Sequence, residues 1–293
     1  MNVIHNILWI TLDSCRLDTA QRAMLPNING LLGSPVGAEV DGTYTYASHQ
    51  AFFTGRLPRR IDSKPLLHEY RKIWVSSSSK NPDATETFEI TENDTIINHY
   101  VSKGYFVLGV GGVQFFNPGL ALNILPNMFP EFLYYGNRGN LPEPQLLPRN
   151  PNSLPMNNVD KISEKVNASN KPYFLFINCS ETHQPFDTPN QTISEDLKVA
   201  IEKMYLASST REIFLQQHPL NNKERELILN AQIKAAEWVD LQFKDLISKL
   251  PLKYPTLCMI MGDHGEELGE HGRYGHGYPS PEVMQVPFWA KII

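Results

Sequence analysis

The feature that most constrains the fold of this chain is a set of short apolar runs, each followed in the sequence by acidic or histidine side chains. The clearest examples are Asn6–Leu12 followed by Asp13, Tyr173–Asn178 followed by His183 and Asp187, and Thr256–Met261 followed by Asp263 and His264. Apolar runs of this length between polar segments are typical of strands that are buried on both faces.

Helical patterns alternate with these runs, and this alternation predicts an α/β fold. The clearest pattern covers about residues 223–250, where apolar side chains recur at steps of three and four: Ala236, Val239, Phe243, Leu246 and Leu250. Such a stripe is one face of a helix that covers a sheet. Weaker patterns predict a helix over 91–103 and strands over 71–76 and 105–109.

A proline-rich segment interrupts this alternation, with eight prolines between Pro118 and Pro155. Proline fixes φ and removes a backbone donor, so the segment cannot be a regular helix or a central strand. Because sheet elements are predicted on both sides of it, we expect a surface insertion at about residues 117–156 of one catalytic domain that spans residues 1–293.

Charge and cysteine content exclude several classes of protein. The net charge of −5 gives no general attraction to nucleic acid or to an anionic membrane. Cys15, Cys179 and Cys258 are odd in number and never in a C-x-x-C pair, which favours a reducing compartment. No run approaches the roughly 18 apolar residues that span a bilayer, and the N-terminal run lacks the features of a signal peptide. We expect a cytoplasmic protein; its oligomeric state is left open.

The carboxyl ends of parallel strands meet at one edge of a sheet, so the side chains that follow these strands should converge there. The tract Gly262–Gly277 adds His271 and His276 to that edge. Mixed Asp oxygen and His nitrogen ligands suit zinc or manganese better than calcium, which prefers oxygen alone. The sequence therefore predicts a metal site, with a divalent cation as cofactor.

The segments that carry this pattern resemble sulfatase-like enzymes of the alkaline phosphatase superfamily. Six of them occur in the family's order: Asn6–Asp18, Leu25–Ile28, Thr45–Arg56, Tyr173–Pro185, Gly262–Gly277 and Val286–Trp289. The resemblance implies an alkaline-phosphatase-like three-layer α/β/α sandwich with a mostly parallel central sheet. It also implies that the nucleophile lies nine residues before Thr54, at Thr45.

Four departures from sulfatases matter for the chemistry. Sulfatases carry at this position a cysteine or serine that is oxidised to formylglycine, which Thr45 cannot form, and His49 occupies the place of their arginine. Ser14 replaces a second Asp, and His264 replaces the Asn of calcium-binding members. The segment Thr45–His49 is closer to the nucleotide pyrophosphatases/phosphodiesterases, and a threonine nucleophile also serves the phosphoethanolamine transferases.

The resemblance assigns roles to the remaining candidates. Asp13, Asp263 and His264 are expected to hold the metal, with the Thr45 hydroxyl as a further ligand and nucleophile. A helix that begins just after Ser48 is expected to aim its backbone N–H groups at the developing charge. His183 and His276 are expected to contact the phosphoryl oxygens, bind a second metal or protonate the leaving group, with Asp187 as a further second-metal ligand. Thr43 and Ser48 are rival nucleophiles. Arg16 and Asp18 match family positions, and a structural ion pair and a catalytic role both stay open for them. Glu266, Glu267, Glu270 and His271 are expected to be solvated loop residues.

These expectations describe a metal-dependent hydrolase of small phosphate or phosphonate esters that acts through a phospho-threonine intermediate. Zinc is the first choice of metal, with manganese or calcium as alternatives. Three other functions stay open: a phosphotransferase of the phosphoethanolamine-transferase type, a sulfatase-like sulfuric ester hydrolase, and a non-catalytic metal-binding relative.

Overall fold

A seven-stranded sheet forms the centre of the computed structural model, which describes residues 4–55, 74–76, 88–90, 95–120, 123–136, 151–210 and 220–293. The strands, in their order across the sheet, are β2 (Val36–Glu39), β11 (Gln285–Ile292), β8 (Thr256–Gly262), β1 (Asn6–Leu12), β7 (Tyr173–Cys179), β5 (Phe106–Gly111) and β6 (Glu131–Tyr134). Strands β8, β1, β7, β5 and β6 are parallel neighbours, whereas β11 is antiparallel to both β8 and β2. The predicted mostly parallel sheet is confirmed.

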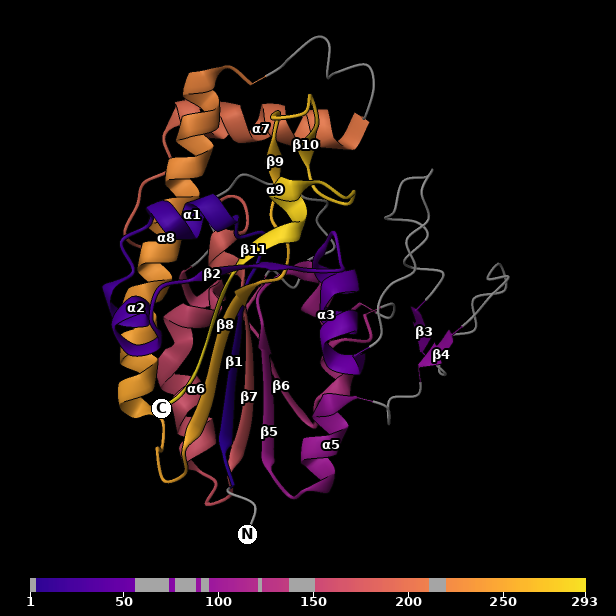
Figure 1. Cartoon of the computed structure of the whole chain (residues 1–293), viewed down its shortest axis with the longest axis vertical. Helices are drawn as coiled ribbons and strands as arrows, with labels where there is room; N and C mark the ends of the chain where they lie inside the picture. The colour runs from indigo at the N-terminus through magenta and orange to yellow at the C-terminus, as the bar shows by residue number, and fades with distance from the viewer. Residues whose placement is uncertain are drawn as a thin grey trace.

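Helices cover both faces of the sheet (Figure 1). One face packs against α1 (Leu17–Arg22), α2 (Pro26–Leu32), α6 (Val159–Asn167) and α8 (Asn222–Lys249), and the other against α3 (Thr45–Thr54) and α5 (Ile96–Ser102). Side chains of β1 alternate between the two faces: Leu8 shares a core cluster with Phe243 of α8, and Trp9 shares one with Phe53 of α3. The three-layer α/β/α architecture is therefore confirmed.

Further helices, strands and 3-10 turns complete the described part of the chain. They are α7 (Glu195–Thr210), α9 (Pro281–Met284), the hairpin β9 (Glu267–Leu268) with β10 (Tyr274–Gly275), the pair β3 (Trp74–Ser76) with β4 (Phe88–Ile90), and the 3-10 turns η1 (Gln114–Phe116), η2 (Pro126–Met128), η3 (Pro151–Ser153), η4 (Pro155–Asn158) and η5 (Ser180–Thr182). Apolar side chains of α7, of the first half of α8 and of the hairpin form a third core cluster. In the part of the chain that the structure describes, every helix is too short or too polar to cross a membrane.

Part of the proline-rich segment, which we predicted to be a surface insertion, belongs to the central sheet and its core. Within it, β6 pairs in parallel with β5 at the edge of the sheet, and Leu125 and Phe129 are buried in the core beside α3. Proline excludes a central strand, but an edge strand that begins just after Pro130 loses no ladder donor to the ring. Residues 121–122 and 137–150 of the predicted insertion lie outside the described residues.

Other predicted elements are found within a few residues of their predicted bounds. The helix predicted over 91–103 is α5, whose N-cap Thr95 accepts a hydrogen bond from the Asn98 backbone. The strand predicted over 71–76 is β3, which pairs with β4 in a separate small sheet. Residues 71–73 and 91–94 are not among the described residues.

Candidate active site

The carboxyl ends of two neighbouring strands place Asp13 and Asp263 side by side. Strands β1 and β8 pair in parallel register, with Leu12 opposite Gly262, so the residue after each strand emerges at the same edge. The Ser14 backbone N–H, in a left-handed conformation with φ 57°, donates to Asp263 Oδ1 at 3.0 Å. Both carboxylates are fully buried.

Helix α3 brings Thr45 to this edge. The helix begins at Thr45 itself, because Tyr44 is extended and its carbonyl accepts the first helical bond from the Ser48 N–H at 3.1 Å. The prediction of a helix start after Ser48 was wrong. Thr45 Oγ1 lies 3.4 Å from Asp13 Oδ2 and 3.4 Å from His264 Nε2. The hydroxyl therefore sits in the first turn, where backbone N–H groups have no helical acceptor and the dipole favours negative charge.

Asp13, Asp263 and His264 form a buried group of potential metal ligands whose donor atoms all lie within 4.8 Å of one another. His264 Nδ1 bonds to the Gly265 carbonyl at 2.9 Å, which leaves Nε2 on the side of Thr45. Asp263 Oδ2 is buried and has no hydrogen-bond partner within the described parts of the chain. A divalent cation fits this set, since it would satisfy an otherwise orphaned carboxylate oxygen with mixed oxygen and nitrogen donors.

Burial and mutual charge shift the pKa values of this group in different directions. Burial, and then the neighbouring Asp13, raise the pKa of Asp263 well above its usual value. Burial also acts to raise the pKa of Asp13, but His183, His264 and the Asn178 hydrogen bond outweigh it and lower that pKa. Burial, and then His276, lower the pKa of His264. Two neighbouring carboxylates that are both buried need a positively charged partner, which agrees with a cation site.

His49 links the Thr45 backbone to strand β1. Its Nε2 lies 2.9 Å from Thr11 Oγ1 of β1, and its Nδ1 lies 2.7 Å from the Thr45 carbonyl oxygen. The ring packs against four aromatic side chains: Phe52, Phe53, Phe116 and Phe176. Burial lowers the pKa of His49 to about 4, despite its hydrogen bond to Thr45. At neutral pH, the position where sulfatases carry arginine therefore holds an uncharged ring.

His183 and His276 lie next to each other, beside the Asp–Asp–His group. Their ring centres are 6.4 Å apart, and the His276 ring centre lies 4.3 Å from that of His264. His183 Nδ1 bonds to the Gln184 carbonyl at 2.8 Å, and His276 Nδ1 bonds to Glu266 Oε1 at 3.1 Å. The structure thus brings both predicted histidines to the Asp–Asp–His group.

Two residues that were expected to be solvated are buried. Glu266 and Glu267 are 2% and 0% exposed, so the expectation was wrong for both, because hairpin β9–β10 folds this glycine-rich tract inward. Glu270 and His271 remain exposed, as expected. Asn178 was missed as a site residue: its amide donates to Asp13 Oδ2 at 3.0 Å. The signal for it was a lone amide at the end of an apolar strand.

The remaining candidates lie beside this centre. Asp187 is buried but is not in the ligand group formed by the described residues around Asp13. The rival hydroxyls of Thr43 and Ser48 are buried and have no hydrogen-bond partner among the described residues. The contacts to Asp13 and His264 are made by the Thr45 hydroxyl and not by either of these two.

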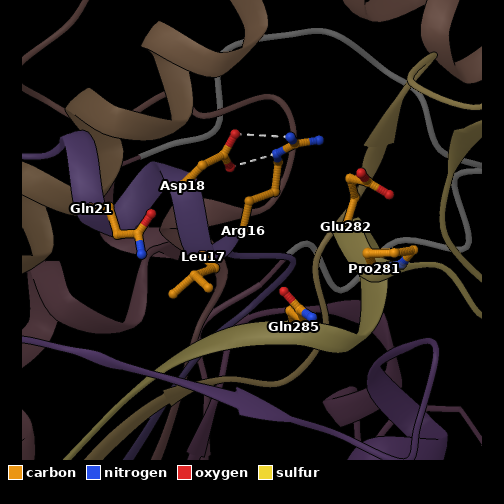
Figure 2. A pocket seen from close by; sticks show the side chains of 7 residues that line it. All are labelled: Arg16, Leu17, Asp18, Gln21, Pro281, Glu282 and Gln285. Carbon is orange, nitrogen blue, oxygen red and sulfur yellow. Dashed lines mark hydrogen bonds and ion pairs between the residues drawn. The ribbon is translucent and has the colours of Figure 1, made fainter.

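The expected ion pair between Arg16 and Asp18 is present, with two contacts of 2.8 and 2.9 Å. It lines a separate pocket of about 190 Å³ whose other walls come from α1, from α9 and from the start of β11 (Figure 2). The opposite guanidinium nitrogen donates to the Glu266 carbonyl at 2.6 Å. Arg16 therefore fixes the backbone next to the site rather than pointing into it.

A second acidic and histidine group lies on the outer side of the hairpin. His271 Nδ1 is 2.8 Å from Glu267 Oε1 and 3.3 Å from Glu282 Oε2, and Arg273 Nε is 3.3 Å from Glu267 Oε2. Two carboxylates facing a guanidinium and an imidazole form an ion-pair network that joins the hairpin to α9.

The protein has the alkaline-phosphatase-like α/β fold, and its buried Asp–Asp–His group suggests a divalent metal site. The chain belongs to the sulfatase family of that superfamily, since the Sulfatase family profile matches residues 6–289.

Two curated proteins illustrate the breadth of the family. Mouse iduronate 2-sulfatase is 24% identical over 98% of this chain and 59% of its own length. The phosphoethanolamine transferase EptA of Helicobacter pylori is 28% identical over 41% of this chain and 22% of its own length. The chain thus spans less than two thirds of either protein.

Solved structures share the fold at low identity. The C-terminal periplasmic domain of EcEptC from Escherichia coli, in complex with zinc, has a TM-score of 0.59 and 15% identity, covering 100% of this chain and 74% of that domain. The phosphonate monoester hydrolase SpPMH from Silicibacter pomeroyi has a TM-score of 0.61 and 14% identity, covering 98% and 68% of the two chains.

Proposed function

We propose that this protein is a metal-dependent hydrolase of small phosphate or phosphonate esters and that Thr45 is its nucleophile. The observation that carries the proposal is the position of the Thr45 hydroxyl, in the first turn of α3 and 3.4 Å from both Asp13 Oδ2 and His264 Nε2. A hydroxyl among potential metal ligands and at a helix N-terminus is suited to become an anion and attack phosphorus.

Asp13, Asp263, His264 and Thr45 would hold the cation. Zinc is our first choice, because the donors are mixed oxygen and nitrogen and because a zinc complex of a structural neighbour exists; manganese and calcium are the alternatives. When bound, such a cation favours the ionised form of the threonine hydroxyl and neutralises phosphoryl charge. Asp263 Oδ2 has no hydrogen-bond partner among the residues that the structure describes, which supports its place in this ligand set.

The reaction divides into two displacements at phosphorus. In the first, Thr45 Oγ1 loses its proton and forms a bond to phosphorus, while the bond to the ester oxygen breaks and the leaving alcohol takes up a proton. In the second, water attacks the phospho-threonine, the bond to Thr45 Oγ1 breaks, and Thr45 regains its proton. His183 and His276 lie where they can bind phosphoryl oxygens or deliver the leaving-group proton; with Asp187 they remain the proposed ligands of a second metal.

A phosphorus ester is favoured over a sulfate ester. Formylglycine carries two hydroxyls when hydrated, and the second one expels sulfate, whereas Thr45 offers one oxygen and needs external water. The absence of formylglycine therefore supports phosphoryl or phosphonyl transfer. His49, with a pKa of about 4, is a second departure from sulfatases, which carry arginine at this position.

Transfer of the group to an alcohol instead of water is the second candidate function. It is supported by the likeness to phosphoethanolamine transferase EptA, although that match covers 41% of this chain. A non-catalytic relative is disfavoured because nucleophile and metal ligands are all present together. The three free, buried cysteines support the proposed reducing, cytoplasmic compartment.

Substitution of Thr45, combined with a panel of esters, tests the proposal. We expect zinc- or manganese-loaded protein to cleave p-nitrophenyl phosphate, bis-p-nitrophenyl phosphate or a phenyl phosphonate ester faster than p-nitrophenyl sulfate. Thr45→Ala should lose at least about 10³-fold in kcat/KM, whereas Thr45→Ser keeps a hydroxyl and should retain measurable turnover. Retained activity in Thr45→Ala would remove Thr45 as nucleophile, and fastest cleavage of the sulfate would overturn the substrate class.

A further inference from the structure

One carboxylate oxygen joins the two segments that carry His183 and His276. Glu266 Oε1 accepts a hydrogen bond from Gln184 Nε2 at 2.9 Å and lies 3.1 Å from His276 Nδ1. Gln184 directly follows His183, whose Nδ1 bonds to the Gln184 carbonyl. A single buried atom therefore ties the chain after β7 to the loop after β10.

We propose that Glu266 is a positioning residue of the active site, and this inference rests on the function proposed above. Glu266 fixes the ring of His276 and, through Gln184, the segment of His183. A carboxylate can only accept at this distance, so the proton of a neutral His276 ring lies on Nδ1. Nε2 is then the nitrogen that faces the substrate. In the neutral ring it is an acceptor that can bind a second metal, and only in the doubly protonated ring can it donate to a phosphoryl oxygen or to the leaving group.

The backbone of Glu266 is itself held in place. Arg16 Nη1 donates to the Glu266 carbonyl, and the same guanidinium is anchored by Asp18 and by Glu270, the latter at 2.7 Å (Figure 2 shows the Arg16–Asp18 contacts). The Glu266 side chain is also fully enclosed, with 3% exposure. A carboxylate that is enclosed and anchored in this way can hold a neighbouring ring at a fixed angle.

The structure also separates Glu266 from the metal ligands. Its oxygens are not in the group that Asp13, Asp263 and His264 form within the described residues, and Oε1 already serves two donors. A carboxylate behind a histidine is the arrangement that orients imidazoles in enzyme sites, and loss of such a partner costs roughly 10- to 100-fold in activity or affinity. We expect Glu266 to act at that level, through His276.

Three variants of zinc-loaded protein separate this role from others. Glu266→Ala removes the acceptor. Glu266→Gln keeps the shape of the side chain and one acceptor oxygen. His271→Ala, in the same glycine-rich tract, is the matched control. We expect kcat to fall roughly 10- to 100-fold in Glu266→Ala, with partial recovery in Glu266→Gln and no loss in His271→Ala. KM and zinc content should stay within about twofold in all three, as a positioning role requires.

A second readout does not depend on turnover. In protein labelled with ¹⁵N-histidine, His276 assigned by comparison with His276→Asn should show its proton on Nδ1, and Glu266→Ala should move it toward Nε2. An unchanged proton position, or zinc loss in Glu266→Ala, would overturn the positioning role. If Thr45→Ala is active while the proton position shifts as expected, the proposed function fails and the hydrogen-bond role of Glu266 stands.

Discussion

His49 shows how the surroundings of a single side chain can alter the chemistry that a family site supports. Four aromatic rings and complete burial hold it neutral, and its two ring nitrogens join Thr11 of β1 to the Thr45 carbonyl. Burial thus keeps the ring uncharged, and its hydrogen bonds hold the Thr45 backbone against β1. At this position, the arginine of sulfatases would put a permanent charge against Asp13 and Asp263.

The neutral state of His49 predicts a specific dependence of stability on pH. Its pKa is about 4 in the folded protein, compared with 6.5 for an exposed histidine ring. The unfolded chain therefore binds more protons between these values, so the stability that His49 contributes is complete above pH 6.5 and is lost as pH falls toward 4. The full loss is about 3 kcal/mol, at roughly 1.4 kcal/mol per pH unit.

Urea unfolding of metal-free protein between pH 4.5 and 7.5 measures this effect. We expect the free energy of unfolding of His49→Gln to depend less steeply on pH than that of the wild type, with the difference confined to the range below pH 6.5. Equal slopes for the two proteins would show that His49 is protonated in the fold.

Some site residues were predictable because they directly follow apolar strands. Asp13, Asp263 and His264 come within two residues of strand ends, and parallel pairing then brings them together. Glu266 was not predictable, because a glycine-rich tract gives no periodicity from which burial can be read. Its inward position depends on the hairpin and on the Arg16 anchor, and the anchor is a contact across 250 residues of sequence.

Helix α8 is the element whose sequence and structure agree best. Its predicted extent of 223–250 compares with Asn222–Lys249, and its predicted apolar stripe lies in the core beneath the sheet. Asn221 and Glu224 form a capping box, in which each side chain accepts from the backbone N–H of the other. Contacts that are local in sequence therefore stabilise the start of this helix.

The capping box yields a prediction at the scale of this helix. Asn221→Ala should lower the free energy of unfolding by about 1 kcal/mol, because the Glu224 backbone N–H loses its side-chain acceptor. Asn222→Ala, one residue further and exposed, is the control and should change stability by under about 0.5 kcal/mol. Chemical denaturation of both variants measures the difference, and equal stabilities would mean that the cap adds nothing.

Elements with weak local signals were predicted less well. The start of α3 was placed four residues late, because Tyr44 is an N-cap without a side-chain acceptor and leaves no sequence mark. Strand β6 is four residues long and lies among prolines, so its pairing with β5 comes from tertiary contact rather than from a pattern. Apolar runs identify buried strands, but not short edge strands.

At the scale of the whole molecule, the site exists only because the sheet is assembled. Its ligands come from the ends of β1 and β8 and from the first turn of α3, which are far apart in sequence. The strand order that makes β1 and β8 neighbours could not be read from the sequence, because apolar patterns give each strand's burial but not its partner. The family resemblance indicated only that these side chains share one site.

This assembly predicts that metal binding stabilises the entire fold. An unfolded chain cannot bring Asp13, Thr45 and Asp263 together, so a cation that binds only the folded state adds RT ln(1 + [L]/Kd), or about 2.7 kcal/mol at a free concentration 100 times Kd. Folding without the cation also leaves two buried carboxylates adjacent, with the pKa of Asp263 raised by burial and by Asp13. Zinc should therefore raise the Tm of the wild-type protein, and a chelator should reverse the change.

Variants locate this effect at the proposed site. Asp263→Asn and His264→Ala should lose most of the Tm increase and most of the zinc found by elemental analysis, since each removes a donor from the buried group. His271→Ala removes a histidine of the outer ion-pair network and should keep the full increase. Thr45→Ala should keep most of it, because three donors remain, while turnover is lost. If zinc stabilised Asp263→Asn and His264→Ala as much as the wild type, the cation would bind elsewhere, and the convergence of β1, β8 and α3 would need another explanation.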